Sequence, residues 1–337
     1  MRMFLKNLCF VYFMIVLGVE TTAHTFGVGI IKVNIRGNSK QVEILSNVKD
    51  MYRSETEGMV PDKVALHHNQ VSDEVLSKAF KDANVSWKDV AFISYSAGPG
   101  LDPALWSGYH IAKQWAVDNN KKLVGINHCC AHLSIGQIMN KLNDPCYLYV
   151  SGVNTQIIVQ EGGKYIVMGE TLDIGLGNML DKFGRIIGLG FPAGPEIEKM
   201  ARGGKYVELP YTVKGMDCSF SGLLTKAKQL FERDSSIRKE DLCFSLQETS
   251  FAMLAEVVER AMAACGKKEL LLVGGVGANK RFCEILDIMC KERGAKFYKV
   301  SMDLAGDQGA MIAWEGYLRQ NQSGDMEVNP HWRADEV

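Results

Sequence analysis

The feature that most constrains the fold is the alternation of short apolar segments with longer amphipathic segments. The apolar runs at residues 90–94, 123–126 and 269–273 have the length and composition of buried strands. Amphipathic segments with apolar residues at helical spacing lie at residues 73–84, 107–118, 131–141, 244–264 and 279–293. Strands that alternate with helices form parallel sheets with covered faces, and ligands bind at the carboxyl ends of those strands. The sequence therefore predicts an α/β protein with a ligand cleft.

A strand–turn–strand pattern occurs twice in the chain. Residues 15–19 and 27–33 flank a first polar turn, and residues 146–150 and 156–159 flank a second one. Similar segments within one chain indicate a repeated architecture, so two similar hairpins predict two similar lobes.

The predicted organisation follows from these hairpins. We expect a first lobe and a second lobe, with an extension before them and a polar tail after them that contributes little to the core. The predicted ranges are 1–13 for the extension, 14–124 for lobe I, 125–304 for lobe II and 322–337 for the tail, with a helix at 305–321 returning to lobe I.

Composition excludes several classes of protein. The chain has 337 residues, of which 47% are hydrophobic, so it is long enough for two domains with a buried core and is not disordered. Lys and Arg number 38 against 39 for Asp and Glu, and this balance gives no overall attraction to nucleic acid or anionic membranes. Nine cysteines without a CxxC pair favour a reducing compartment such as the cytoplasm.

The first residues imitate a signal peptide. Arg2 and Lys6 precede an apolar run at residues 8–17, but no A-x-A-like cleavage site follows it. The apolar run is also shorter than the roughly 20 residues needed to cross a bilayer. We therefore expect no export and no membrane association, with Met14 as an alternative start.

Three turns of small residues could approach a phosphate. They are Glu20–Thr25, Ser151–Thr155 and Gly274–Asn279. A backbone without bulky side chains can bring its N–H groups close to phosphate oxygens. The third turn follows a strand and opens a helix, yet it is neither G-x-G-x-x-G nor a P-loop. Each turn alone could be purely structural, whereas three in one chain favour a nucleotide.

Two histidines stand at helical spacing. His128 and His132 are four residues apart, so both imidazoles can face one metal ion, while Tyr149 approaches from a neighbouring strand. Asp307 precedes a small apolar helix and either caps that helix or adds an oxygen ligand. Two imidazoles, a phenolate and a carboxylate suit iron or zinc. Core or surface roles for the histidines remain the alternative.

Other charged residues fit a nucleotide or a nucleic acid. Asp181 and Glu198 can accept hydrogen bonds from ribose hydroxyls, or they are simply exposed helix charges. A basic cluster could neutralise RNA phosphates or form a solvated face. Its members are Lys199, Arg202, Lys205, Lys214, Lys226 and Lys228.

Seven ordered motifs resemble one family, the tRNA threonylcarbamoyladenosine transferases of the archaeal and eukaryotic type, which form the catalytic subunit of the KEOPS complex. The motifs lie at residues 127–132, 148–156, 169–173, 209–217, 219–222, 245–248 and 274–279. The resemblance implies two ribonuclease-H-like lobes with a central nucleotide cleft, as in actin and the sugar kinases.

The resemblance also implies roles for individual residues. The implied metal ligands are His128, His132, Tyr149 and Asp307, and no further catalytic residue is implied. The segment Tyr149, Val150, Ser151, Gly152 and Val153 would line the acyl and phosphate region, Asp181 and Glu198 would meet the ribose, and Gly194 and Asn279 would border the nucleoside.

By this resemblance, the chain transfers the threonylcarbamoyl group of threonylcarbamoyl-AMP to N6 of adenosine 37 in tRNAs that read ANN codons. The implied cofactor is one divalent metal, iron or zinc, with Mg²⁺ accompanying an ATP-type nucleotide in the same cleft. The implied partners are tRNA and KEOPS subunits, namely a protein-kinase-like ATPase and a small dimerising subunit. Since the net charge is balanced, we expect partner subunits to supply much of the RNA affinity.

Two departures and two alternative functions remain at this point. Val153 stands where the family usually has glycine, and Gln308 replaces a usual asparagine beside Asp307. An ATPase or small-molecule kinase of the same fold is the main alternative, but it leaves the histidine pair unexplained. A metalloprotease would need the pattern H-E-x-x-H, and this chain has cysteine at position 129 instead of glutamate.

Overall fold

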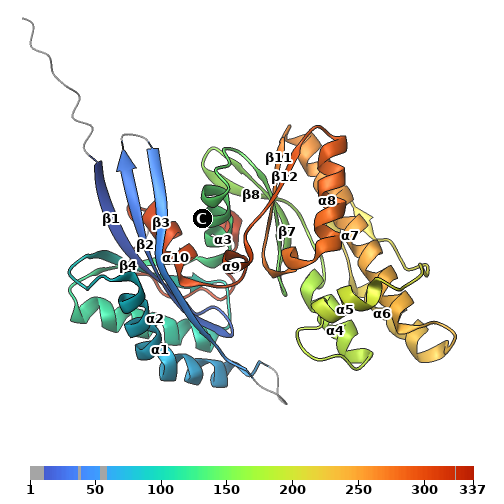
Figure 1. Cartoon of the computed structure of the whole chain (residues 1–337), viewed down its shortest axis with the longest axis horizontal. Helices are drawn as coiled ribbons and strands as arrows, with labels where there is room; N and C mark the ends of the chain where they lie inside the picture. Colours follow the sequence, from blue (N-terminus) through green and yellow to red (C-terminus); the bar gives the residue numbers. More distant parts are fainter. Residues whose placement is uncertain (1–10, 37–38, 54–58, 323) are drawn as a thin grey trace, which may run out of the picture. The chain divides into compact units, whose positions relative to one another are not determined.

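The computed structural model describes residues 11–36, 39–53, 59–322 and 324–337, and the chain forms two compact units (Figure 1). Unit 1 comprises Met1–Ile138 and Asp307–Glu336, and unit 2 comprises Met139–Gly306 together with Val337. The first ten residues of the predicted extension lie outside the described residues. The chain therefore leaves unit 1, builds unit 2 and returns to unit 1.

Unit 1 contains a five-stranded sheet in the order β3-β2-β1-β4-β5. The strands are β1 (Val11–Glu20), β2 (Thr25–Arg36), β3 (Ser39–Met51), β4 (Val90–Gly98) and β5 (Lys122–Asn127). The first three strands form an antiparallel meander, and β4 and β5 are parallel to β1. The parallel strands are buried almost throughout, as expected when both faces of a sheet are covered.

Unit 2 contains a second five-stranded sheet in the order β12-β11-β6-β7-β8. Its strands are β6 (Cys146–Val150), β7 (Thr155–Glu161), β8 (Lys164–Glu170), β11 (Glu269–Val273) and β12 (Lys296–Lys299). A separate small hairpin joins β9 (Val213–Lys214) to β10 (Asp217–Cys218). Here too a meander of β6, β7 and β8 is followed by two parallel strands.

The two sheets have the same topology. In chain order, β1 to β5 correspond to β6, β7, β8, β11 and β12, with identical neighbours and identical relative directions. The prediction of two similar α/β lobes from the two hairpins is therefore confirmed. The positions of the two first hairpin turns also correspond, so residues 21–24 of unit 1 occupy the place of residues 151–154 of unit 2.

The helices of unit 1 are α1 (Pro61–Ala83), α2 (Asp102–Asp118), α3 (His128–Met139, whose last residue is assigned to unit 2) and α10 (Gly309–Arg319). Helix α10 lies against β1 and β2 (Figure 1). Glycines in the sheet permit this close approach, since a Cβ at Gly18 or Gly29 would lie 2.2 or 2.0 Å from the α10 backbone. Any larger residue there would push the helix off the sheet.

The helices of unit 2 surround a hydrophobic core that is built largely on the long helix α7. They are α4 (Leu176–Ile186), α5 (Gly194–Ala201), α6 (Ser221–Arg233), α7 (Lys239–Ala264), α8 (Lys280–Glu292) and α9 (Met302–Ala305). Phe251 of α7 stacks on Phe282 of α8 with ring centroids 4.6 Å apart. Unit 2 also contains the 3-10 turn η1 (Gly275–Ala278), and unit 1 contains the 3-10 turn η2 (Ala334–Glu336).

The predicted helices and strands are all present, although several helix starts and one lobe boundary differ. Helices α2 and α7 each begin five residues before their predicted starts. Helix α1 begins at Pro61, twelve residues before the predicted start, because proline fixes the backbone angle that suits the first helical position. Residues 125–138, which we expected in the second lobe, belong to unit 1. Strand β5 leads directly into α3, so the histidine segment stays with the sheet that precedes it.

The expectation that residues 322–337 contribute little to the core is wrong. Met326, Val328 and Trp332 pack against the hydrophobic core of unit 1, and Ala334 is buried. The backbone N–H of Asn329 donates to the carbonyl of Ala97 on β4 at 2.7 Å. We call residues 324–336 the C-terminal tail. Its composition is polar, but it is fastened to the sheet mainly by main-chain groups, which composition does not reveal.

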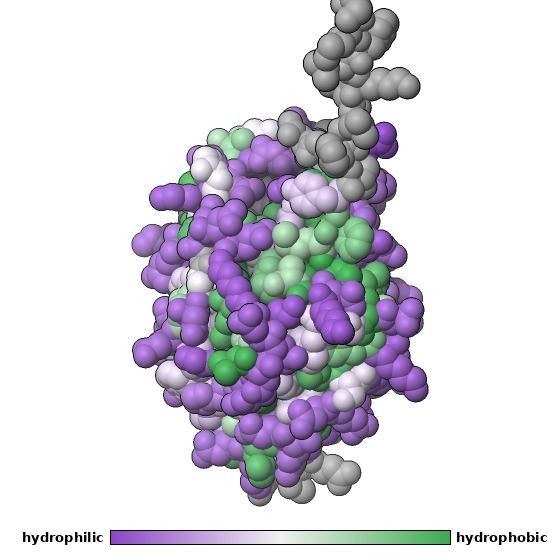
Figure 2. Space-filling view, turned by 90° about the vertical axis from the view of Figure 1, so that its left-hand side faces the viewer, coloured by the Kyte–Doolittle hydropathy of each residue, from purple (hydrophilic) through white to green (hydrophobic). Residues whose placement is uncertain are grey.

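One face of unit 1 is mostly hydrophilic (Figure 2). Figure 2 shows purple side chains over most of this face, with a hydrophobic green area among them. Two large aromatic side chains at the start of β1, Tyr12 and Phe13, are more than half exposed, and the Lys32 ammonium lies 4.7 Å from the Phe13 ring centroid. None of the helices in the described part of the chain is both long enough and apolar enough to cross a membrane.

Candidate metal centre and nucleotide-binding residues

Three of the four predicted metal ligands lie together in unit 1. His128 and His132 occupy one face of α3, with their rings nearly perpendicular and 4.7 Å apart. An oxygen of Asp307, which directly precedes α10, lies 3.3 Å from Nε2 of His132 and 3.6 Å from Nε2 of His128. One potential ligand atom from each residue lies within 4.8 Å of the others. Two imidazoles and a carboxylate at this spacing fit a Zn²⁺ or Fe²⁺ ion.

The environment of this trio controls its protonation. Burial lowers the pKa of His132, which keeps its imidazole neutral, as a metal ligand must be. Burial alone would raise the pKa of Asp307, but its hydrogen bond with His132 and the charge of His128 hold that pKa well below its usual range. The carboxylate is therefore ionised and can offer an anionic oxygen to a cation.

Glu20 orients His128. The Glu20 side chain is fully buried at the end of β1, and its Oε2 lies 2.9 Å from Nδ1 of His128. Its Oε1 accepts hydrogen bonds from the N–H and the hydroxyl of Thr22, at 2.8 and 2.5 Å. A carboxylate only accepts, so the proton of the pair lies on Nδ1, and Nε2 is the nitrogen that faces Asp307.

The same contact changes the basicity of His128. Burial would lower the pKa of His128, but the charge of Glu20 and the hydrogen bond to it outweigh burial and raise this pKa to about 9. A histidine in this state carries a proton on Nε2 at neutral pH, and a cation that binds there must displace it. Carboxylates that receive the second N–H of a ligating histidine fix its ring and tautomer.

The fourth predicted ligand lies in unit 2. Tyr149 is on β6, one residue before the strand ends, and only 1% of its surface is exposed. Its assignment as a ligand stays a prediction.

The turn after β6 is built from main-chain hydrogen bonds. The carbonyls of Ser151 and Gly152 accept from the N–H groups of Gly177 and Asn178 in the first turn of α4, at 3.2 and 2.9 Å. These N–H groups are thus engaged by protein oxygens. Val150 is buried, whereas Gly152 is exposed, so the predicted acyl and phosphate segment reaches the surface only after the strand.

Val153 does not strain this turn. Its backbone φ is not positive, and 71% of the residue is exposed. The valine therefore occupies the position usually held by glycine without requiring a left-handed backbone.

In the equivalent turn of unit 1, two backbone N–H groups already donate to protein oxygens. Thr21 N–H donates to the hydroxyl of Ser96 at 2.9 Å, and Thr22 N–H donates to Glu20. The prediction that Glu20–Thr25 presents N–H groups to a phosphate is therefore wrong for these two groups. This turn instead holds the carboxylate that orients His128.

The third predicted turn joins β11 to α8. Gly274 has φ +94°, and a Cβ at this position would lie 2.3 Å from the carbonyl oxygen of Val150. Only glycine permits this contact between the ends of the adjacent strands β11 and β6. Asn279 ends the turn and caps α8, since its Oδ1 accepts from Phe282 N–H at 3.0 Å. Its Nδ2 donates to Gln247 of α7 at 2.8 Å.

The predicted nucleoside residues in unit 2 hold neighbouring backbone segments. Asp181 of α4 accepts from Ala193 N–H at 2.7 Å, directly before Gly194 begins α5. Burial raises the pKa of Asp181 in spite of this hydrogen bond. Glu198 of α5 accepts from the N–H of Lys280 at 3.0 Å, where α8 begins. Hydrogen bonds from these two carboxylates therefore link α4 to the start of α5, and α5 to the start of α8. Neither Asp181 nor Glu198 is simply an exposed charge on a helix.

Gln308, rather than Asp307, caps α10. The Oε1 of Gln308 accepts from Met311 N–H at 3.0 Å, so the alternative role of Asp307 as the helix cap is excluded. The Gln308 side chain is fully buried, and its Nε2 has no hydrogen-bond partner among the described residues. The longer side chain therefore stabilises the helix start and does not contact the Asp307 carboxylate through a hydrogen bond.

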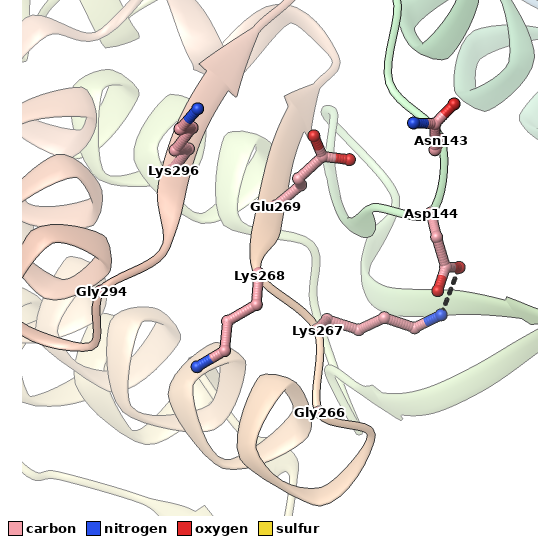
Figure 3. A pocket seen from close by; sticks show the side chains of 8 residues that line it. All are labelled: Asn143, Asp144, Gly266, Lys267, Lys268, Glu269, Gly294 and Lys296. Carbon is pink, nitrogen blue, oxygen red and sulfur yellow. Dashed lines mark hydrogen bonds and ion pairs between the residues drawn. The ribbon is translucent and has the colours of Figure 1, made fainter.

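A pocket of about 430 Å³ lies elsewhere in unit 2 (Figure 3). It is found where β11 and β12 begin, at the opposite end of β11 from the Gly274 turn. The Lys267 ammonium contacts the Asp144 carboxylate at its edge. The lining residues are Asn143, Asp144, Gly266, Lys267, Lys268, Glu269, Gly294 and Lys296. None of the predicted site residues lines it, so it is not the predicted nucleotide site.

The roles of two residues beside the trio were not predicted from the sequence. Glu20 stands at the end of a buried strand, where a charged residue signals a specific partner. Asn127 directly precedes α3, and its Oδ1 accepts from Cys130 N–H at 3.1 Å. An asparagine before a helical segment is a known cap signal.

The chain is similar in sequence to proteins of one named family. Residues 42–314 match the family model described as tRNA N6-adenosine threonylcarbamoyltransferase. A protein of that name from Thermococcus kodakarensis is 49% identical over 331 residues, which cover 96% of this chain and 98% of the relative. The corresponding protein from Thermococcus sibiricus is 48% identical, with 96% and 99% of the two chains covered. A "Probable bifunctional tRNA threonylcarbamoyladenosine biosynthesis protein" from Methanobrevibacter smithii is 46% identical over 96% of this chain and 60% of its own.

Solved structures support the fold. HypF from T. kodakarensis matches with a TM-score of 0.63 and 16% identity, covering 95% of this chain and 50% of HypF. A full-length HypF in a phosphate- and nucleotide-bound form gives a TM-score of 0.62 at 12% identity, covering 92% and 47%. Together with the repeated sheet topology, these matches support the two-lobed, ribonuclease-H-like fold. The family model and the near-complete alignments settle the relationship: the chain belongs to the tRNA N6-adenosine threonylcarbamoyltransferase family.

Proposed function

We propose that this chain transfers the threonylcarbamoyl group from threonylcarbamoyl-AMP to N6 of adenosine 37 in tRNAs that read ANN codons, and that the transfer depends on a bound metal ion. The observation that carries the proposal is the convergence of His128, His132 and Asp307 in a chain whose relatives bear the name of this activity. A kinase of the same fold would leave this trio without a role.

The reaction requires a strongly activated donor. The exocyclic amine of adenine is a poor nucleophile because its lone pair is delocalised into the ring. The mixed anhydride with AMP activates the acyl carbon and provides a stable leaving group. A metal ion at the trio would supply Lewis-acid stabilisation of the charge that develops on donor oxygens.

The donor set indicates which metal is suitable. Two imidazole nitrogens and one carboxylate oxygen fit iron or zinc better than Mg²⁺, which prefers oxygen ligands. Tyr149 is the proposed fourth ligand. We propose that His128 binds through Nε2, because its Nδ1 faces Glu20 at 2.9 Å. The negative charge of Asp307 and Glu20 would balance the cation in this buried setting.

We propose that unit 2 binds the adenylate. Segment 149–153 would line the acyl and phosphate groups, and the Gly274 turn brings its backbone against Val150 of this segment. Asp181 and Glu198 would accept from the ribose hydroxyls with the oxygens that backbone N–H groups leave available. Gly194 and Asn279 would border the nucleoside.

Mass spectrometry of tRNA nucleosides tests the proposal. The purified chain, supplied with threonylcarbamoyl-AMP and the partner subunits, should convert adenosine 37 to its threonylcarbamoyl derivative. Replacing both His128 and His132 by alanine should abolish the product, whereas the same double replacement at His110 and His331 should leave it unchanged. Transfer that survives the first double replacement would reject the metal assignment.

We also propose that tRNA and partner polypeptides act with this chain in the cytoplasm. All six members of the basic cluster at residues 199–228 are exposed, which leaves them accessible to RNA phosphates. The M. smithii relative extends beyond the match, so a protein of this kind occurs joined to a further segment. We propose a kinase-like ATPase and a small dimerising subunit as separate partners here.

Salt dependence of tRNA binding tests this division of labour. The isolated chain should bind tRNA weakly, and addition of the partners should raise the affinity. Reversing the charge of Lys226 and Lys228 should reduce the slope of log affinity against log salt by roughly 1 to 2. Tight binding by the isolated chain would contradict the proposed contribution of the partners.

A further inference from the structure

Asn127 connects the histidine helix to the C-terminal tail. This residue ends β5, and its side chain is almost completely buried, with 2% of the residue exposed. Its Oδ1 accepts from Cys130 N–H, which places Asn127 as the N-cap of α3. Its Nδ2 donates to the main-chain carbonyls of Trp332 and Arg333, each at 3.2 Å. One amide therefore serves the helix and the tail at once.

The orientation of this amide follows from its partners. A backbone N–H can only meet the amide oxygen, and the two carbonyls can only meet the amide nitrogen. Both hydrogens of the side chain are used. If the tail moved away, both hydrogens of the amide would lose their main-chain acceptors, and an unsatisfied donor costs free energy.

Further contacts hold the tail against the same part of unit 1. The thiol of Cys130 lies 3.7 Å from the carbonyl oxygen of Ala334, so the first turn of α3 contacts the tail twice. The hydroxyl of Tyr95 donates to the carbonyl of Met326, and Gly125 N–H donates to the carbonyl of Gly324 at 3.0 Å. The tail thus runs along the ends of β4 and β5, where α3 begins.

We propose that Asn127 is a positioning residue that fixes α3, and with it the two histidines, by fastening the C-terminal tail across the start of that helix. This inference rests on the proposed metal centre. His128 is the first residue of α3 and His132 lies one turn later, so a small tilt of the helix start moves both ligand nitrogens. Residues that hold metal ligands in place contribute about 10-fold to 100-fold in metal affinity.

Two variants separate the cap from the tail. Asn127→Ala removes both contacts, whereas Asn127→Asp keeps an equally good cap but presents oxygens to the carbonyls of the tail. We expect both variants to weaken zinc binding about 10-fold, measured with zinc alone in competition with a chromophoric chelator. Added negative charge by itself would strengthen cation binding, so a loss in Asn127→Asp has the opposite sign to a simple charge effect.

Hydrogen exchange reports the tail directly. The N–H of Asn329 should exchange faster in both variants than in the unchanged chain, because the tail is loosened. Asn119→Ala is the matched control, since the Asn119 side chain also donates to a main-chain carbonyl, that of Trp115 at 2.9 Å, at the end of α2. It should change neither the zinc affinity nor the exchange at Asn329.

The outcomes are distinguishable. Weakened zinc binding together with faster tail exchange in Asn127→Asp supports the inference, even if Asn127→Ala does not fold. Unchanged zinc affinity with a loosened tail, or unchanged tail exchange, overturns the inference and leaves the metal centre standing. If the unchanged chain binds no zinc, iron or cobalt, the metal centre itself is overturned, and the inference with it.

Discussion

The first hairpin turn of each unit occupies the same place in the same topology, yet the two turns do different chemistry. In unit 1 the turn follows Glu20, the last residue of β1, which is fully buried and contacts His128. In unit 2 the turn after β6 contains Val153, which is 71% exposed, and its carbonyls accept from the start of α4. One turn orients His128, and the other presents main chain at the surface.

This difference shows that the two units share a sheet topology but do not carry the same functional side chains. All seven histidines of the chain lie in unit 1, and unit 2 has none. Unit 1 therefore carries all the imidazole groups of the chain, and imidazole is a common ligand of transition metals in proteins. Unit 2 carries glycine turns and carboxylates that hold backbone segments, which suits a neutral, polar nucleoside.

The largest expected effect concerns the carboxylate of the trio. Asp307→Ala should weaken zinc binding about 100-fold to 1000-fold, because each ligand of a protein zinc site contributes roughly 3 to 4 kcal/mol. Asp303→Ala is the matched control, since Asp303 lies four residues earlier and is exposed. Competition with a chelator measures both variants. Equal zinc affinities of Asp307→Ala and Asp303→Ala would show that Asp307 is not a ligand. They would also contradict the proposed contrast between the two units.

A pH effect on stability should arise in unit 1. Burial lowers the pKa of His68 from 6.5 to about 4, and its Nε2 donates to the carbonyl of Ala23 at 2.9 Å. The neutral form is favoured by folding, so its contribution is complete above pH 6.5 and is lost as the pH falls toward 4. The loss should reach about 3 kcal/mol of unfolding free energy.

Urea unfolding at pH 7 and at pH 4.5 measures this loss. His68→Gln keeps a side-chain donor but does not titrate, so its stability should fall much less between the two values. His331→Gln, at an exposed histidine of the same unit, should behave as the unchanged chain does. An unchanged pH dependence in His68→Gln would assign the effect to other groups.

A glycine tests the strand-end contact of unit 2. Gly274→Ala should lower the unfolding free energy by about 2 kcal/mol, because the residue has φ +94° and its new Cβ would meet the carbonyl of Val150. Gly275→Ala should be nearly neutral, since nothing lies within 4 Å of a Cβ there. Urea unfolding measures both variants. Equal losses of unfolding free energy in Gly274→Ala and Gly275→Ala would contradict the proposed importance of this contact between the strand ends.

The smallest predicted effect sharpens the comparison of the two turns. Glu20→Gln should weaken zinc binding about 10-fold, or about 1.4 kcal/mol, because a neutral amide holds the Nδ1 proton of His128 less strongly. Glu170→Gln is the control in unit 2, where the carboxylate accepts from the side chain of Gln156 at 2.9 Å. It should leave zinc affinity unchanged. The same response in both variants would deny Glu20 a specific role.

Periodicity and turn chemistry predicted much of the fold. The five amphipathic helices and the repeated hairpin are present because local apolar spacing decides both. The pair His128 and His132 was predictable from its spacing on one helix. Asp307 lies 175 residues from His132, and no local pattern indicates that they meet. From the residues alone, a ligand role for Asp307 was one of two alternatives, and the motif resemblance implied that role.

Other features could not be read from sequence for physical reasons. The partner of Glu20 lies 108 residues away, so nothing local distinguishes its role from that of a turn residue. The C-terminal tail is held by main-chain groups such as the carbonyls of Trp332 and Arg333, and every residue carries such groups. Polar composition therefore led to the wrong expectation for this segment.

Metal dependence of the transfer itself is the most direct test of the central claim. Transfer of labelled threonine from threonylcarbamoyl-AMP to tRNA should be measured with the purified chain and its partners, after chelation and again after zinc or iron is restored. We predict that transfer is lost on metal removal, returns with the metal, and does not return in Asp307→Ala. Undiminished transfer by protein shown to be free of metal would contradict the account.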